Sequence, residues 1–115
     1  GYSYKNKGDF SVDKETALKV VLNFRKAIET NGIKVDKLIL FGSYCSGNQK
    51  EGSDIDLVVI SDDFNGKGYW ERIDILSSAI YEVFAPIEAI AMTPKEWENK
   101  ESMIVEYAKY GEVVA

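Results

Sequence analysis

Apolar residues recur at every third or fourth position in the first third of the chain. The stripe is made by Ala17, Val21, Phe24 and Ile28. This spacing predicts an amphipathic helix, because residues three and four positions apart lie on the same helix face. Ser11 or Asp13 can cap the start of the helix, and Asn31-Gly32 is a strong signal for its end.

Three short apolar runs predict strands. They are Lys37–Phe41, Asp54–Ile60 and Ile87–Met92. The second half of residues 54–60 is apolar at every position, which is typical of a strand that is buried on both faces. Residues 43–53 are rich in Gly, Ser, Asn and Lys. They predict a loop between the first two strands, with room for one helical turn at its start.

A second helix is predicted after a loop over residues 61–68. Its apolar face carries Ile73, Leu76, Ile80 and Phe84. Pro86 ends this helix, because the residue before a proline avoids the helical conformation. Trp70, near the start of the helix, is expected to pack against a neighbouring element.

The last predicted helix begins with a capping box at residues 93–96. Thr93 is the N-cap, Pro94 is the first helical residue, and Glu96 reaches back to the cap. The helix then continues through Trp97 as one element to a stop at Gly111. The order helix, strand, loop, strand, helix, strand, helix indicates an α/β or α+β fold.

Composition bounds the architecture. The 115 residues, 45% hydrophobic and 29% charged, fit one domain spanning 1–115, with the polar and aperiodic residues 1–10 as a loose lead-in. No apolar run approaches the ~20 residues that a membrane span needs. No charged start is followed by an apolar stretch, so nothing indicates a secretory signal. We therefore expect a cytoplasmic protein with no membrane partner.

Charge and residue types narrow the chemistry. The net charge of −5 argues against a domain that grips nucleic acid through its phosphates, although it leaves room for a nucleotide whose charge is met by metal ions. The chain has no histidine and a single cysteine, Cys45. These counts exclude a Ser-His-Asp triad, a histidine zinc site and an internal disulfide. Any metal would be held by oxygen atoms, which favours Mg²⁺, Mn²⁺ or Ca²⁺.

Two aspartates open the second strand. Asp54 and Asp56 are two positions apart, so on a strand both carboxylates point to the same face. Each raises the pKa of the other unless a cation lies between them, and a divalent metal resolves that repulsion. Two carboxylates can also bridge two metals about 3.5–4 Å apart, the arrangement used in phosphoryl transfer.

A glycine-serine pair follows the first strand. Gly42 allows close approach of the backbone to a ligand, and the N–H groups that follow, together with the Ser43 hydroxyl, can bind an anion. Phosphates at this pair and metals at the aspartates would form a nucleoside triphosphate site. Glu88, in the third strand, is the candidate for a third carboxylate. Tyr44 is expected at the surface.

Gly42-Ser43, ten intervening residues and Asp54-Ile55-Asp56 resemble the signature of the polymerase β-like nucleotidyltransferase superfamily. The short chain and the wording "FGS…SDIDLVV" resemble its minimal nucleotidyltransferase branch. The resemblance implies a palm-like fold, in which a mixed sheet of at least three strands is covered by helices. It also implies transfer of a nucleoside monophosphate, AMP from ATP, to an acceptor hydroxyl. Asp54 and Asp56 would hold two Mg²⁺ ions, with Mn²⁺ as the alternative.

The resemblance assigns further roles to single residues. Glu88 falls on the third family carboxylate, which would hold the catalytic ion and act as base, and Gly42 and Ser43 would seat the phosphates. Two positions depart from the family pattern. Glu88 stands where aspartate is usual, and Ser46 stands where many members carry a basic residue.

The acceptor and the partner stay open at the level of the sequence. The resemblance implies a small helical partner protein of the HEPN type and a toxin–antitoxin pair, with the acceptor hydroxyl on the partner. The main alternative is an antitoxin module that binds nucleotide or partner without catalysis. A domain that modifies aminoglycoside-like drugs is a third candidate, and a homo-oligomer also remains open.

Overall fold

The computed structural model describes residues 14–42, 44, 54–99 and 103–114. The helices and strands, in chain order, are α2 (Lys14–Thr30), β1 (Lys37–Phe41), β2 (Ile55–Ile60), the short 3₁₀ helix η1 (Asp62–Phe64), α4 (Tyr69–Val83), β3 (Ile87–Met92), α5 (Pro94–Asn99), α6 (Met103–Ala108) and β4 (Glu112–Val113). Both candidate caps of α2, Ser11 and Asp13, and the lead-in 1–10 lie outside the described residues.

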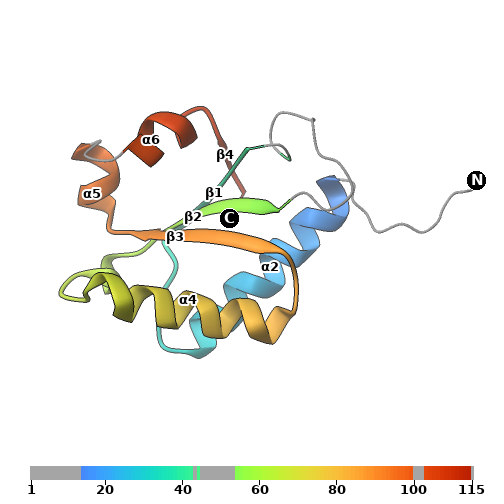
Figure 1. Cartoon of the computed structure of the whole chain (residues 1–115), viewed down its shortest axis with the longest axis horizontal. Helices are drawn as coiled ribbons and strands as arrows, with labels where there is room; N and C mark the ends of the chain where they lie inside the picture. Colours follow the sequence, from blue (N-terminus) through green and yellow to red (C-terminus); the bar gives the residue numbers. More distant parts are fainter. Residues whose placement is uncertain (1–13, 43, 45–53, 100–102, 115) are drawn as a thin grey trace, which may run out of the picture.

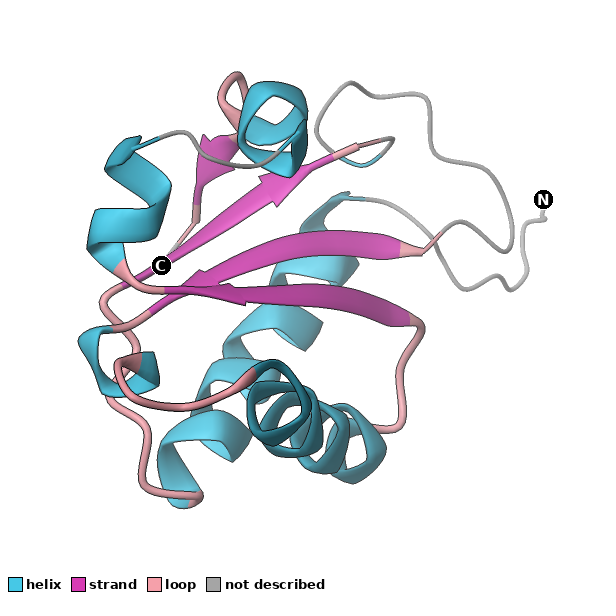
Figure 2. Ribbon diagram, turned by 60° about the vertical axis from the view of Figure 1, so that its left-hand side comes forward, coloured by secondary structure: helices cyan, strands magenta, loops and turns pink. Residues whose placement is uncertain are grey.

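The strands form one mixed sheet in the order β3-β2-β1-β4 (Figures 1 and 2). β1 pairs antiparallel with β2 and with β4, and β2 pairs parallel with β3. The three predicted strands are therefore confirmed, with β2 starting one residue later than expected, at Ile55. The two-residue strand β4 was not predicted. The mixed sheet with its covering helices confirms the α+β class.

Helices cover both faces of the sheet. Figures 1 and 2 show α2 and α4 together on one face and α5 and α6 on the other. Alternate strand residues serve the two layers: Leu57 and Val59 of β2 pack with α2 and α4, whereas Val58 and Ile60 pack with the α5 and α6 side. Cover on both faces explains why the central strand is apolar without alternation.

Helix α4 departs from its predicted apolar face at its end, and the separate prediction for Trp70 also fails. Leu76 is buried and Ile80 is half-buried, as the spacing predicted. Phe84, in contrast, is 89% exposed and lies after the helix as its C-cap, in the left-handed conformation with φ 57°. Trp70 is 73% exposed, so the prediction that it packs against another element was wrong.

The capping box of α5 is confirmed. The Thr93 hydroxyl accepts from the Glu96 N–H at 3.1 Å, and the Glu96 carboxylate accepts from the Thr93 N–H at 2.9 Å. The prediction of one continuous last helix was wrong, because the segment contains two helices, α5 and α6. Trp97 packs against the buried cluster on their face of the sheet, as expected.

Arg72 joins α4 to three other segments. Its guanidinium donates to both carboxylate oxygens of Glu96, at 2.8 and 3.2 Å, and to the carbonyls of Phe64 and Lys67. A longer bond of 3.5 Å reaches the carbonyl of Ala91 in β3. The arginine therefore fixes the start of α4 against η1, β3 and α5. Among the described residues, no helix is long and apolar enough to cross a bilayer.

Candidate active site

Asp56 and Glu88 lie side by side at one end of the sheet. They are register partners in the parallel pair β2–β3, and strands so paired lie about 4.8 Å apart. Along its strand, Asp56 alternates with Leu57 and shares the face of Val58 and Ile60, which is the α5 and α6 face. The alternation of β3 places Glu88 on the same face. The structure thus brings together two of the predicted carboxylates.

Asp54 completes a group of three acidic residues. It precedes β2 by one residue and is exposed, so it lies just outside the strand in which it was predicted. The pKa of Asp56 is raised, first by burial of its carboxyl group and then by the negative charges of Glu88 and Asp54. This electrostatic effect means that all three carboxylates share one region.

Gly42 makes room for the Asp56 carboxylate. The glycine follows Phe41, the register partner of Asp56, and has φ +76°. A Cβ atom at this position would come within 3.1 Å of Asp56 Cγ and much closer still to one carboxylate oxygen. A side chain here is excluded both by the left-handed backbone and by the carboxylate. The sequence identified Gly42 as a ligand-approach residue, whereas the group that approaches it here is Asp56.

The rest of the predicted phosphate loop falls outside the described residues. This applies to Ser43, to Ser46 and to Cys45. Tyr44 is described, and it is only 5% exposed and packs in the core cluster beneath the α2 and α4 face. The expectation of a surface tyrosine was therefore wrong. The polar residues around Tyr44 in the sequence do not indicate that its side chain is buried.

The acidic group has the donor chemistry of a divalent cation site. Its ligands would be carboxylate oxygens, which Mg²⁺ and Mn²⁺ prefer. Within the described ranges, no lysine or arginine forms an ion pair with Asp54, Asp56 or Glu88. In the same ranges, no three acidic side chains are close enough together to enclose an ion. The donor set fits a metal, and closing around one would require the side chains to move.

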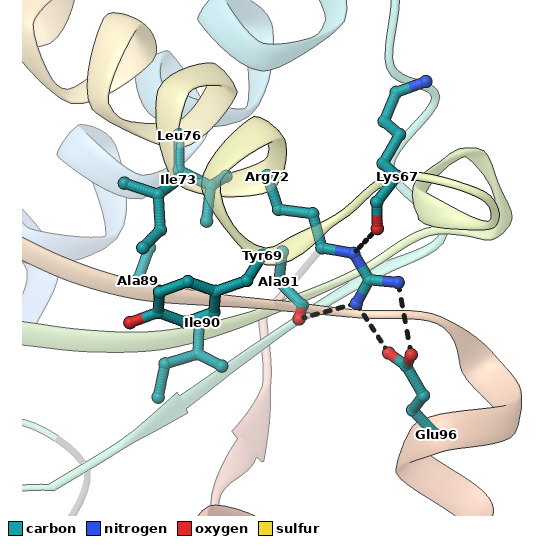
Figure 3. A pocket seen from close by; sticks show the side chains of 9 residues that line it. All are labelled: Lys67, Tyr69, Arg72, Ile73, Leu76, Ala89, Ile90, Ala91 and Glu96. Atoms are coloured by element: carbon teal, nitrogen blue, oxygen red, sulfur yellow. Dashed lines mark hydrogen bonds and ion pairs between the residues drawn. The ribbon is translucent and has the colours of Figure 1, made fainter.

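A separate hollow of about 400 Å³ lies beside β3 (Figure 3). Its lining residues are Lys67, Tyr69, Arg72, Ile73, Leu76, Ala89, Ile90, Ala91 and Glu96. Neither Asp54, Asp56 nor Glu88 lines it, although Ala89 directly follows Glu88 in the chain. No sequence pattern predicts this hollow, because its residues come from a loop, two helices and a strand.

Comparisons with known proteins agree on a class. The family model described as a nucleotidyltransferase domain matches residues 21–110. Two proteins of Methanocaldococcus jannaschii, each named a putative protein adenylyltransferase, are similar in sequence. One is 42% identical over 90 residues, which cover 77% of this chain and 83% of the relative. The other is 37% identical over 59 residues, covering 51% of this chain and 59% of that relative's length.

Solved structures share the fold at low sequence identity. A crystal structure of a putative nucleotidyltransferase from Sulfolobus solfataricus has a TM-score of 0.68 and 16% identity, covering 95% of this chain and 89% of that chain. A crystal structure of a toxin–antitoxin with AMP-PNP has a TM-score of 0.58 and 18% identity, covering 85% of this chain and 72% of that chain. At sequence identities this low, the structural similarity establishes a shared fold.

Proposed function

The chain belongs to the nucleotidyltransferase domain family, and on that premise we propose that it transfers AMP from ATP to a hydroxyl group of a partner protein. The observation that carries the proposal is the register pairing of Asp56 with Glu88, with Asp54 close enough to raise the pKa of Asp56. The two relatives named as putative protein adenylyltransferases support a protein acceptor.

The transfer makes one bond and breaks another. The oxygen of the acceptor hydroxyl attacks the α-phosphorus of ATP, and a phosphodiester bond forms. The bond from the α-phosphorus to the oxygen that bridges to the β-phosphate breaks, and pyrophosphate leaves. We assign the hydroxyl proton to Glu88, because it is an exposed carboxylate on the face that Asp56 shares.

Divalent cations would be held by Asp54, Asp56 and Glu88, with Mg²⁺ as the expected ion and Mn²⁺ as the alternative. The oxygen donors and the lack of a described cation beside them support this assignment. When bound, such ions neutralise the charge of the phosphates and of the leaving group. Gly42 and Ser43 would seat the phosphates beside them; Tyr44, the next residue, is buried in the core.

The proposed partner is a small helical protein of the HEPN type, in a toxin–antitoxin pair. The structural neighbour described as a toxin–antitoxin with AMP-PNP supports both a partner and an adenine nucleotide. The net charge of −5 favours a basic partner, since opposite charges speed the encounter of two proteins. Its acceptor hydroxyl must come within near-attack distance of the α-phosphate.

Labelled ATP tests the proposal directly. The protein is incubated with Mg²⁺ and extract of its native cell, once with ATP labelled at the α-phosphate and once with ATP labelled at the γ-phosphate. Transfer of AMP places only the α label on a protein. Glu88→Gln, which keeps the shape and removes the charge, should lower labelling about 10²–10⁴-fold, the usual contribution of a general base. Glu82→Gln on the exposed side of α4 is the matched control.

Two outcomes would contradict the assignment. Equal labelling by wild type and Glu88→Gln would remove Glu88 from the reaction, and label on RNA or on a small drug would replace the protein acceptor. A non-catalytic antitoxin is the second candidate, because Glu88 stands where the family pattern usually has aspartate. It predicts Mg²⁺-dependent ATP binding with no labelled product from the native extract.

A further inference from the structure

Strand β3 forms a free edge of the sheet. It lies last in the order β3-β2-β1-β4, and its single strand neighbour in the described sheet is β2. The N–H groups of Ile55 and Ser61 donate to the carbonyls of Pro86 and Met92. In a parallel pair this alternation directs the backbone groups of residues 88, 90 and 92 toward β2. The backbone groups of residues 87, 89 and 91 therefore point away from the sheet.

The middle of this edge is unpaired among the described residues. The N–H of Ile87 donates to the carbonyl of Ala85, and the carbonyl of Ala91 accepts from Arg72. The N–H and C=O of Ala89 have no partner in the described ranges. Edge strands that expose such groups can bind a further strand. Among these edge residues no lysine or proline blocks the approach, since Pro86 lies before the strand.

The hollow described above runs along this same edge. Its lining includes Ala89 and Ala91, which face α4, and Ile90, which faces α5, so it opens around the side of β3 rather than within one layer. Figure 3 shows Tyr69 and Ile73 of α4 beside the strand residues. The hollow is apolar beside Ala89, where Tyr69, Ile73 and Leu76 line it, and charged at its other end, where Lys67, Arg72 and Glu96 line it. The small alanine side chains leave room for an incoming chain.

Register connects this edge to the acidic group. Residues directly opposite each other in neighbouring strands place their side chains on the same face, about 5 Å apart. A residue opposite Glu88 on an added strand would therefore direct its side chain to the face of Glu88 and Asp56. Its immediate neighbour in that strand, opposite Ala89, would direct its side chain to the other face, toward Tyr69 and Ile73.

We propose that the free edge of β3 binds the acceptor as an added strand, with a hydroxyl-bearing residue opposite Glu88 and an apolar residue next to it in the hollow. The inference rests on the proposed transfer of AMP to a protein. The occupant is an extended segment of the partner, because the N–H and C=O of Ala89 can pair with another backbone in the geometry of a sheet. Basic residues in that segment suit the net charge of −5. The hydroxyl oxygen then forms the bond to the α-phosphorus, its proton passes to Glu88, and pyrophosphate departs.

A synthetic peptide tests the docking without requiring catalysis. The peptide has a central tyrosine with valine on each side, then threonines, and a lysine at each end. Added to isotope-labelled protein without ATP, it should shift the NMR signal of the Ala89 amide and slow its hydrogen exchange. N-methylation of the peptide at successive residues should weaken binding about threefold to tenfold at every second position, where an N–H faces β3.

Variants on the protein side sharpen the test. Ala89→Pro removes the N–H that points away from the sheet and keeps the hydrogen bonds between β3 and β2. Proline is tolerated at such a position of an edge strand. It should weaken peptide binding by a similar factor. Tyr69→Ala should weaken it by removing one wall of the hollow. Tyr81→Ala is the matched control, because Tyr81 is another largely exposed tyrosine on α4 and does not line the hollow. A circular dichroism spectrum confirms that each variant is folded.

The outcomes separate the two proposals. Docking at the edge of β3 is supported if N-methylation weakens binding at every second peptide residue and the NMR signal of the Ala89 amide shifts. If this is found but no AMP is transferred, the proposed function is wrong and the docking proposal stands. Transfer to a protein acceptor with a uniform N-methyl pattern and an unshifted Ala89 amide would overturn docking alone. Failure of the folded wild type to bind the peptide at millimolar concentration would also overturn it.

Discussion

Acidic residues lie near both ends of β3, and their surroundings differ. After the strand, Glu96 receives two hydrogen bonds from Arg72 and one from the Thr93 N–H, and the pKa of its carboxyl group is lowered, chiefly by the Arg72 hydrogen bonds. At the start of the strand, Glu88 lies beside Asp56. The pKa of Asp56 is raised by burial and by its acidic neighbours, and no described cation pairs with it.

The difference separates a structural carboxylate from one that is available for a ligand. The charge of Glu96 is already neutralised within the protein, so removing it should damage the fold. The charge of Asp56 is opposed by its surroundings, so removing it should relieve the fold and abolish the proposed activity. Clustering of like charges without a partner is a mark of functional sites, although ion-pair networks also shift pKa values.

Among the variants that test the difference between Asp56 and Glu96, Gly42→Ala should have the largest effect, a loss of AMP transfer. The new Cβ would collide with the Asp56 carboxylate and displace it, and misplacement of a reacting group by about 1 Å can lower a rate about 100-fold. The left-handed backbone costs an alanine about 1–2 kcal/mol of stability as well. Gly66→Ala is the matched control, because its φ is +80° with nothing within 4 Å. It should lose similar stability and keep AMP transfer; equal transfer by both variants would contradict the role of Gly42.

Glu96→Gln tests the structural carboxylate. Loss of the charge-assisted bonds from the half-buried Arg72 should lower the free energy of unfolding by about 1 kcal/mol at pH 7, since the Glu96 side chain is 41% exposed and solvent screens the pair. The pKa of Glu96 is lowered in the fold, so its contribution is present above its ordinary value of 4.5 and is lost as the pH falls through the folded value. Urea unfolding at several pH values should show the gap between wild type and variant closing in acid. Glu98→Gln in the same helix should show no gap.

Asp56→Asn should have the smallest effect on stability. Unlike Glu96→Gln, it should raise the free energy of unfolding. Because the folded pKa of Asp56 is raised, the wild type loses stability as the pH rises from the ordinary value of 3.8 through the folded value. The asparagine variant avoids this loss. At pH 7, with EDTA present, its melting temperature should therefore be higher than that of the wild type, by a small amount because the carboxyl group is only partly buried. If the variant melts at a lower temperature than the wild type at pH 7, a neighbouring group must stabilise the charged Asp56 carboxylate in the folded protein, contrary to this prediction.

Local patterns carried most of the fold. The stripe of α2, the three apolar strands and the capping box of α5 each depend on residues close together in the chain, and all appear in the structure. The errors have distant causes. The two residues of β4 have no pattern of their own and form a strand because β1 offers them an edge. Phe84 has helical spacing from Ile80, yet the chain leaves the helix at that residue to reach β3.

The site was predictable in part for the same reason. The spacing of Asp54 and Asp56 indicated shared chemistry, and the register of β2 with β3 adds Glu88 to them. That register is a tertiary fact that no spacing encodes. Nor do the sequence neighbours of Gly42 indicate that the Asp56 carboxylate lies against it. Tyr44 is likewise surrounded by polar residues in the sequence, although its side chain is buried in the core. The phosphate role of Ser43 remains a prediction.

The Arg72 cluster also bears on the order in which the chain folds. Its partners Phe64, Lys67, Ala91 and Glu96 are all within 24 residues of the arginine. The ion pair of Lys14 with Glu112, which ties α2 to β4, spans 98 residues. Short loops close at lower entropic cost, and local contacts form sooner. The segment from β2 to α5 is therefore expected to assemble as an early folding unit, onto which the two ends of the chain close last.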